Sequence, residues 1–178
     1  MKNLSATLLI TLLSSVILYG QEAITPRPSP IAIVTMKYED SYVKVTYSQP
    51  HKRGREIFGD LVPYNQVWRT GANEATEITT TGDLMIGNKK LKAGTYSLFT
   101  IPSPDKWIVI FNKHLGQWGS YNYTEKADEL RVEVPTSELT NVVFEPFTIS
   151  FEQQNEVAQM ELKWDTTKVA VPIKFITD

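Results

Sequence analysis

Trp68, Arg69 and Asn73 stand close together around Gly71, and side chains of these types can recognise a small ligand. The Arg guanidinium presents a planar fork of donors that matches a carboxylate or a phosphate. Trp offers a flat apolar face for a sugar ring, and Asn offers both a donor and an acceptor that can fix the ligand's orientation. The stretch therefore predicts a binding site for a small anionic or sugar-like ligand.

The same residues also admit a purely structural interpretation. Arg69 can pair with Glu74 or Glu77, or stack on Trp68, and so tie a long loop to the sheet. Asn73 can satisfy backbone groups of that loop. The two interpretations are compatible, because a fixed loop can form the wall of a pocket.

Two further sequence features extend the binding hypothesis. Arg55 belongs to the basic run 51–55, which meets an anion or, more commonly, forms a solvated loop face. Trp118 lies between two glycines in a segment rich in aromatic residues. It predicts either a stacking platform for a sugar or a plug over the open end of the fold.

Catalysis by this chain is a weaker prediction. Glu56 and Glu74 flank the long loop and are candidates for acid–base work on glycans or esters. Glycoside cleavage needs two carboxylates facing one cleft, whereas most glutamates are surface charges. No Gly-x-Ser-x-Gly elbow and no phosphate-binding glycine loop is present.

Composition argues against several other classes. The chain has 178 residues, no cysteine, two histidines far apart and a net charge of −2. The lack of cysteine excludes disulfides and thiolate chemistry, and His51 and His114 do not have metal-ligand spacing. We therefore expect no metal and no cofactor, and the charge argues against nucleic acid.

Apolar and polar residues alternate with a period of two in the segments that must position these residues. Val43, Val45 and Tyr47 alternate with polar neighbours, as in a half-buried strand, and 107–111 is an apolar run that predicts a strand buried on both faces. Further strand patterns fall at 84–86, 94–101, 130–134, 147–151, 160–164 and 169–175. Strands at this spacing predict a single all-β, antiparallel, jelly-roll-like β-sandwich, with 50–75 as a long functional loop.

The first residues predict export. Lys2 precedes a short apolar run at 6–18, as in a signal peptide at 1–20 that is cleaved after Gly20, and the rival interpretation is an uncleaved anchor. A proline-rich leader at 21–35 would precede one domain at 36–178. Without cysteine the product is not a lipoprotein, so we expect a soluble periplasmic or secreted protein with no transmembrane segment.

Two motifs carry a resemblance to a known family. Gly-Arg-Glu-Ile-Phe-Gly at 54–59 and Trp-Arg-Thr-Gly-Ala-Asn at 68–73, with Lys-Ala-Gly-Thr-Tyr-Ser-Leu-Phe at 92–99, resemble the exported bacterial domain-of-unknown-function family twenty-nine eleven. The resemblance runs from about residue 41 to 173. It implies a Gram-negative envelope or secreted protein, and it supplies no substrate, cofactor or catalytic residue.

These observations leave three candidate functions. The leading hypothesis is a binding module of the envelope, with a pocket between the loops 50–75 and 112–125. Arg69 would pair with an anionic group, Trp68 and Trp118 would form apolar walls, and Asn73 would orient the ligand. The alternatives are a hydrolase of envelope glycans or esters, and a structural or interaction protein.

Overall fold

The computed structural model describes residues 25–176. Eleven strands fill this range: β1 (Ile31–Tyr38), β2 (Ser41–Ser48), β3 (Ala72–Thr80), β4 (Leu84–Ile86), β5 (Lys89–Leu91), β6 (Gly94–Ile101), β7 (Lys106–Asn112), β8 (Asp128–Glu138), β9 (Phe144–Gln154), β10 (Val157–Asp165) and β11 (Thr167–Phe175). The one helix described is a short 3₁₀ turn, Glu125–Ala127. No helix in the described range is long and apolar enough to cross a membrane. The expected signal peptide at 1–20 lies outside the described residues.

The prediction of an all-β, antiparallel protein is confirmed. Every strand pair is antiparallel, and Val43, Val45 and Tyr47 are buried as their alternation indicates. The turn at Gly87 joins β4 to β5, with Ile86 opposite Lys89. Local hydrophobic alternation therefore decided which segments became strands.

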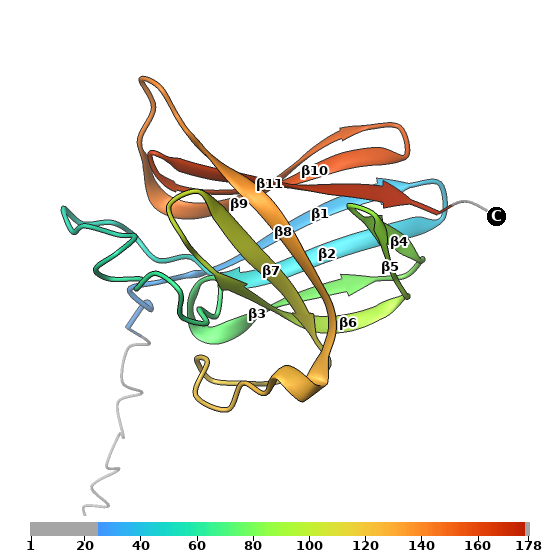
Figure 1. Ribbon diagram of the computed structural model, residues 1–178, viewed down its shortest axis with the longest axis horizontal. Helices are drawn as coiled ribbons and strands as arrows, with labels where there is room; N and C mark the ends of the chain where they lie inside the picture. Colours follow the sequence, from blue (N-terminus) through green and yellow to red (C-terminus); the bar gives the residue numbers. More distant parts are fainter. Residues whose placement is uncertain (1–24, 177–178) are drawn as a thin grey trace, which may run out of the picture.

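The strands form one continuous sheet that curls toward closure. Its main path is β1-β2-β3-β6-β7-β8-β11-β10-β9, and β4 pairs with β11 at the side. The last strand of this path, β9, returns to the segment that follows β2. There the Lys52 N–H donates to the Glu145 carbonyl at 2.7 Å, and the Phe147 N–H donates to the Pro50 carbonyl at 2.8 Å. Figure 1 shows the resulting barrel-like shape.

The expected two-sheet, jelly-roll sandwich is not confirmed. The long strand β8 pairs with β7 from Asp128 to Pro135 and with β11 from Thr136 to Glu138. Because one strand serves both partners in turn, the ladder passes from one half of the molecule to the other without a break. In Figure 1, β8 crosses from the lower strands to the upper ones. The fold is therefore a single sheet, nearly closed as a barrel.

Aromatic rings fill one end of the barrel interior. Trp68 stacks on Trp164 with ring centroids 5.9 Å apart, and it meets Trp107 and Phe147 edge to face. Phe58 lies 4.9 Å from Trp107. Trp107 and Trp164, expected in the core from their strand positions, are fully buried. This cluster carries a large share of the buried apolar area and fixes the loop that contains Phe58 and Trp68.

A second apolar cluster covers the outer face of β6 and β7. Phe99 and Ile110 are buried there, and Tyr123 packs on Phe99 at 5.1 Å. The apolar run 107–111 is thus buried on both faces, as predicted. The Tyr123 hydroxyl donates to Asp128 at 2.7 Å, and Arg131 donates to the same carboxylate at 2.6 Å. These bonds hold the segment 112–125 against the sheet.

Candidate functional site

The candidate site lies in the connection between β2 and β3, at one end of the barrel (teal, left in Figure 1). Trp68 anchors this connection. Its N–H and carbonyl exchange hydrogen bonds with Thr100 of β6, at 2.7 and 2.9 Å. Its indole Nε1 donates to the Gly71 carbonyl at 3.0 Å. The backbone that carries the neighbouring Arg69 is therefore fixed to β6 through Trp68.

The two residues after Arg69 are tightly constrained, Thr70 by its backbone angle and Gly71 by a close contact. Thr70 is buried with a φ of 55°, which a β-branched residue rarely adopts. Its hydroxyl donates to Thr100 Oγ1 at 3.1 Å, and its carbonyl accepts from the Thr76 hydroxyl at 2.6 Å. A Cβ at Gly71 would lie 2.9 Å from the Ser48 carbonyl oxygen, so only glycine fits. Backbone strain of this kind persists where the surrounding contacts determine it, often at functional sites.

Arg69 itself is half-buried and forms no ion pair with any residue in the range 25–176. Its Nε is buried and has no hydrogen-bond partner among them. Burial lowers the pKa of Arg69, and the phenol of Tyr121 partly offsets that effect. The guanidinium is therefore a partly desolvated cation that has no ion-pair partner among residues 25–176.

The structural clamp predicted for Arg69 does not form. Glu74 pairs with Arg27 at 2.7 Å, and Glu77 accepts a hydrogen bond from the Gly116 N–H at 3.2 Å. No stacking of Arg69 on Trp68 is found within the described part of the chain. The loop is held instead by its backbone and by the Trp68 indole.

A cavity of about 180 Å³ adjoins Arg69. Its charged lining groups are Arg69 and Arg55, and no carboxylate lines it. Arg55 donates to the carbonyls of Lys52 and His51, at 3.0 and 2.6 Å, which holds its side chain in place. Apolar walls come from Leu61, Val62, Pro50, Trp68 and Trp164. The cavity thus combines two guanidinium groups with several apolar side chains, in a lining that also includes Ser29, Gly71 and Ala72.

The structure therefore brings together three of the five predicted binding residues: Arg69, Arg55 and Trp68. Asn73 and Trp118 do not line this cavity. They belong to a short ladder in which the Gly119 N–H donates to the Asn73 carbonyl at 2.9 Å and Trp118 lies opposite Glu74. Trp118 is 57% exposed, so it does not plug the barrel. The Arg69 cavity is therefore not formed between the loops 50–75 and 112–125, as expected, but between the loop 50–75, Ser29 and Trp164.

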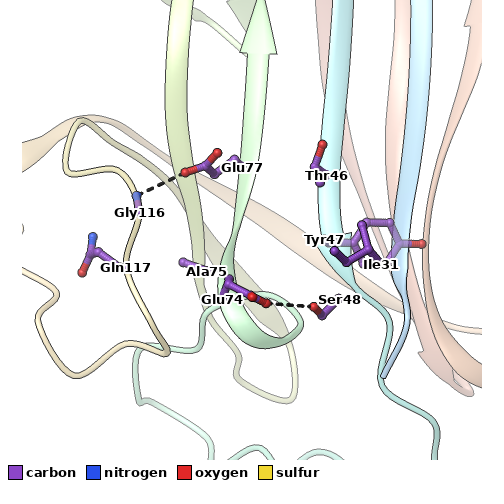
Figure 2. Close-up of a pocket in the computed structure, with 9 residues that line it drawn as sticks. All are labelled: Ile31, Thr46, Tyr47, Ser48, Glu74, Ala75, Glu77, Gly116 and Gln117. Carbon is purple, nitrogen blue, oxygen red and sulfur yellow. Dashed lines mark hydrogen bonds between the residues drawn. The ribbon is translucent and has the colours of Figure 1, made fainter. Parts of the chain in front are cut away.

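The two candidate catalytic carboxylates lie apart. Glu56 is exposed and lines neither the Arg69 cavity nor the cavity that contains Glu74. Glu74 lines a separate cavity with Glu77, and Figure 2 shows their carboxylates turned to opposite sides, toward Ser48 and Gly116. The hydrogen bond from Arg27 holds the pKa of Glu74 below its usual range, with a smaller contribution from Ser48. A carboxylate with a lowered pKa is a poor general acid.

His51 and His114 do not assemble a metal site. No group of three or more histidines and carboxylates within residues 25–176 could hold a metal ion. His114 takes part through its backbone, since its N–H donates to Asn112 at 2.9 Å and its carbonyl accepts from Ser97 and Gln117.

Sequence reasoning missed two contributors to these cavities. Trp164 was expected only in the core, yet it also lines the Arg69 cavity. Ile31 lines the second cavity with its side chain 60% exposed. An apolar residue on the outer side of a strand can indicate that the strand lines a cavity. The sequence does not show which other residues line that cavity, because they come from distant segments.

Comparison with known proteins gives one match. Residues 29–173 match a family described as "Protein of unknown function (DUF2911)". Searches of curated proteins and of solved structures found no match.

Proposed function

Because the chain belongs to the DUF2911 family of proteins of unknown function, its function must be inferred from its sites, and we propose that it binds a small anionic, sugar-like ligand at Arg69. The observation that carries the proposal is the half-buried Arg69 guanidinium, whose Nε has no partner among residues 25–176 and which adjoins a cavity that no carboxylate of this range lines. A uronic acid, a sugar ring that carries one carboxylate, fits these features.

Arg69 has no counter-charge among residues 25–176. A partly desolvated cation without a counter-charge is costly, and burial already lowers the pKa of Arg69. An arriving carboxylate supplies the missing charge and an acceptor for Nε. Hydrogen bonds between a guanidinium and a carboxylate are stronger than neutral ones and often bidentate. Arg55 adds a second positive charge at the same cavity, so the site favours an anion over a neutral sugar.

The apolar walls argue for a ring on that anion. Trp68, Trp164 and Leu61 line the cavity, and aromatic and aliphatic walls with a few polar groups are typical of small-ligand sites. A bare phosphate or sulfate would use only the guanidinium groups. The mixed lining therefore favours an anionic group attached to a less polar body.

The alternatives are less well supported. A hydrolase needs two carboxylates at one cleft, and Glu56 and Glu74 lie apart, with the pKa of Glu74 lowered rather than raised. A purely structural role predicts a paired Arg69, which the described residues do not provide.

Isothermal titration with glucuronate tests the proposal. Glucose is the matched neutral ligand, and inorganic phosphate is the bare anion. We expect glucuronate to bind more tightly than both, and Arg69→Met to lose at least tenfold in affinity. Lys37→Met removes an exposed charge that lines no described cavity and should leave binding unchanged. Equal binding of glucuronate by the wild type and Arg69→Met, or no binding at all, would overturn it.

We also propose that the protein is exported, on the basis of its first twenty residues. Mass spectrometry of the protein recovered from fractionated cells measures this. An N-terminus near residue 21 in a fraction outside the cytoplasm is expected, and an uncleaved chain in the cytoplasm would contradict it.

A further inference from the structure

A second cavity, of about 270 Å³, lies on the outer face of the barrel. Ile31 of β1 and Thr46 of β2 line it on one side, Glu77 of β3 lines its floor, and Gly116 and Gln117 of the 112–125 segment line the other side (Figure 2). It shares no lining residue with the Arg69 cavity. The segment 112–125 therefore forms one wall of a groove on the sheet.

The cavity exists because β3 departs from its register. Thr46 pairs with Glu77, whereas Ser48, only two residues along β2, pairs with Ala72. The extra residues of β3 bulge outward, and Asn73 within them has a φ of 57°. Because of the bulge, Glu74 and Glu77 both line this cavity, with their carboxylates at opposite sides of it (Figure 2), whereas a regular strand would place residues three apart on opposite faces.

The charge of this cavity is opposite to that of the Arg69 cavity. Its charged lining residues are Glu74 and Glu77, and no basic residue lines it. Gln117 also lines it, and its amide is turned away from the two carboxylates (Figure 2) and donates to the His114 carbonyl. Ile31, Ala75 and Tyr47 add apolar surface, so the lining suits a cation on an apolar body.

The chain itself shows a guanidinium bound to one of these carboxylates. Arg27 Nη1 donates to Glu74 Oε1 at 2.7 Å from the segment that precedes β1, although Arg27 does not line the cavity. The segment is attached to the body at two more points: the Arg53 side chain donates to the Pro28 carbonyl, and the Gln49 N–H donates to the Pro30 carbonyl. Arg27 and Glu74 are 50% and 46% exposed, so a competing cation can reach this pair.

We propose that this cavity binds small ligands that carry a guanidinium or ammonium group on an apolar body, and that Arg27 competes with them for Glu74. The ligand's cation pairs with Glu74 in place of Arg27, and the negative charge of Glu77, at the opposite side of the cavity, adds to the attraction. The apolar part of the ligand lies against Ile31 and Ala75. Because an exposed ion pair is weak, Arg27 lowers the affinity of the site without closing it. The segment that contains Arg27 thus raises the ligand concentration needed to fill the cavity.

The experiment follows amide signals of Ala75 and Gly116 by NMR during titration with n-butylguanidinium. n-Butylurea, nearly identical in shape and uncharged, is the matched control. We expect saturable shifts with n-butylguanidinium alone. Arg27→Ala should bind about two- to fivefold more tightly than the wild type, which is the contribution of an exposed ion pair.

A second variant separates charge from shape. Glu77→Gln, made together with Arg27→Ala, keeps an acceptor for the Gly116 N–H but removes one charge, and we expect it to bind at least fivefold more weakly than Arg27→Ala alone. Arg69→Met should bind n-butylguanidinium as the wild type does, so this result is independent of the anion site. Equal shifts with n-butylurea, unchanged affinity in Arg27→Ala, or unchanged affinity after loss of the Glu77 charge would each overturn the proposal.

Discussion

Replacing Arg69 with Met separates a binding arginine from a structural one by its effect on stability. Met retains most of the aliphatic packing of Arg and removes the charge. Because Arg69 pairs with no carboxylate in the range 25–176, the substitution leaves no buried charge without a partner. The loss of a half-buried, unsatisfied guanidinium also removes a desolvation cost.

The expected change in unfolding free energy is therefore within about 1 kcal/mol, as for substitutions that break no network. A clamp would behave differently, since breaking a buried ion pair costs about 3–5 kcal/mol. For a domain of this size each kcal/mol shifts the midpoint by about 2–4 °C. The binding account thus predicts a shift of at most about 4 °C, and the clamp predicts a fall of about 6–20 °C.

Thermal unfolding followed by circular dichroism measures this, with Lys37→Met as the control. Glucuronate at about 100 times its dissociation constant should add about 2.7 kcal/mol to the wild type and nothing to Arg69→Met. A large fall in the midpoint of the variant without ligand would refute the reasoning, because it would show that Arg69 stabilises the fold through a partner.

Three further predictions concern Gly71, Tyr123 and Glu74. Gly71→Ala should destabilise the protein by about 1–3 kcal/mol in urea unfolding, because the new Cβ would lie 2.9 Å from the Ser48 carbonyl oxygen; wild-type stability would show that the loop is free to move. Burial, and next the bond to Asp128, raise the pKa of Tyr123 to about 12, so the unfolded chain loses this proton first as the pH rises. Stability should fall between about pH 10 and 12, and Tyr123→Phe should lack that component; identical alkaline profiles would contradict the assignment. Arg27 lowers the pKa of Glu74, so the small stability from this pair is present at neutral pH and is lost as the pH falls through the lowered pKa. In Arg27→Ala, a carbon-detected NMR titration should give a higher pKa for Glu74, and an unchanged value would show that the pair does not form in solution.

The strands could be predicted from the sequence because their signal is local. The alternation of Val43, Val45 and Tyr47 and the apolar run 107–111 depend only on which faces are buried, and both were confirmed. The near-closed barrel could not be predicted in this way. It depends on β8 changing partner after Pro135 and on the contact of Pro50 with Phe147, and no local pattern encodes such pairings.

The residues of the candidate site could also be predicted from local sequence, whereas their contacts with distant segments could not. Trp68, Arg69 and Arg55 were identified from residue type and spacing, and they do line one cavity. The partners of Arg69 were predicted wrongly, because Glu74 is taken by Arg27, which lies 47 residues earlier in the chain. The divergence of Glu74 and Glu77 depends on a bulge in β3, which only the register with β2 reveals.

We propose that the Arg69 side chain binds an anion, and NMR of its Nε–H group in a ¹⁵N-labelled sample tests this most directly. The Arg69 signal is identified by its loss in Arg69→Met. On saturation with glucuronate, this signal should shift and its exchange with water should slow, because the buried Nε gains an acceptor, while glucose should leave it unchanged. An Arg69 Nε–H signal that glucuronate does not move would contradict the account.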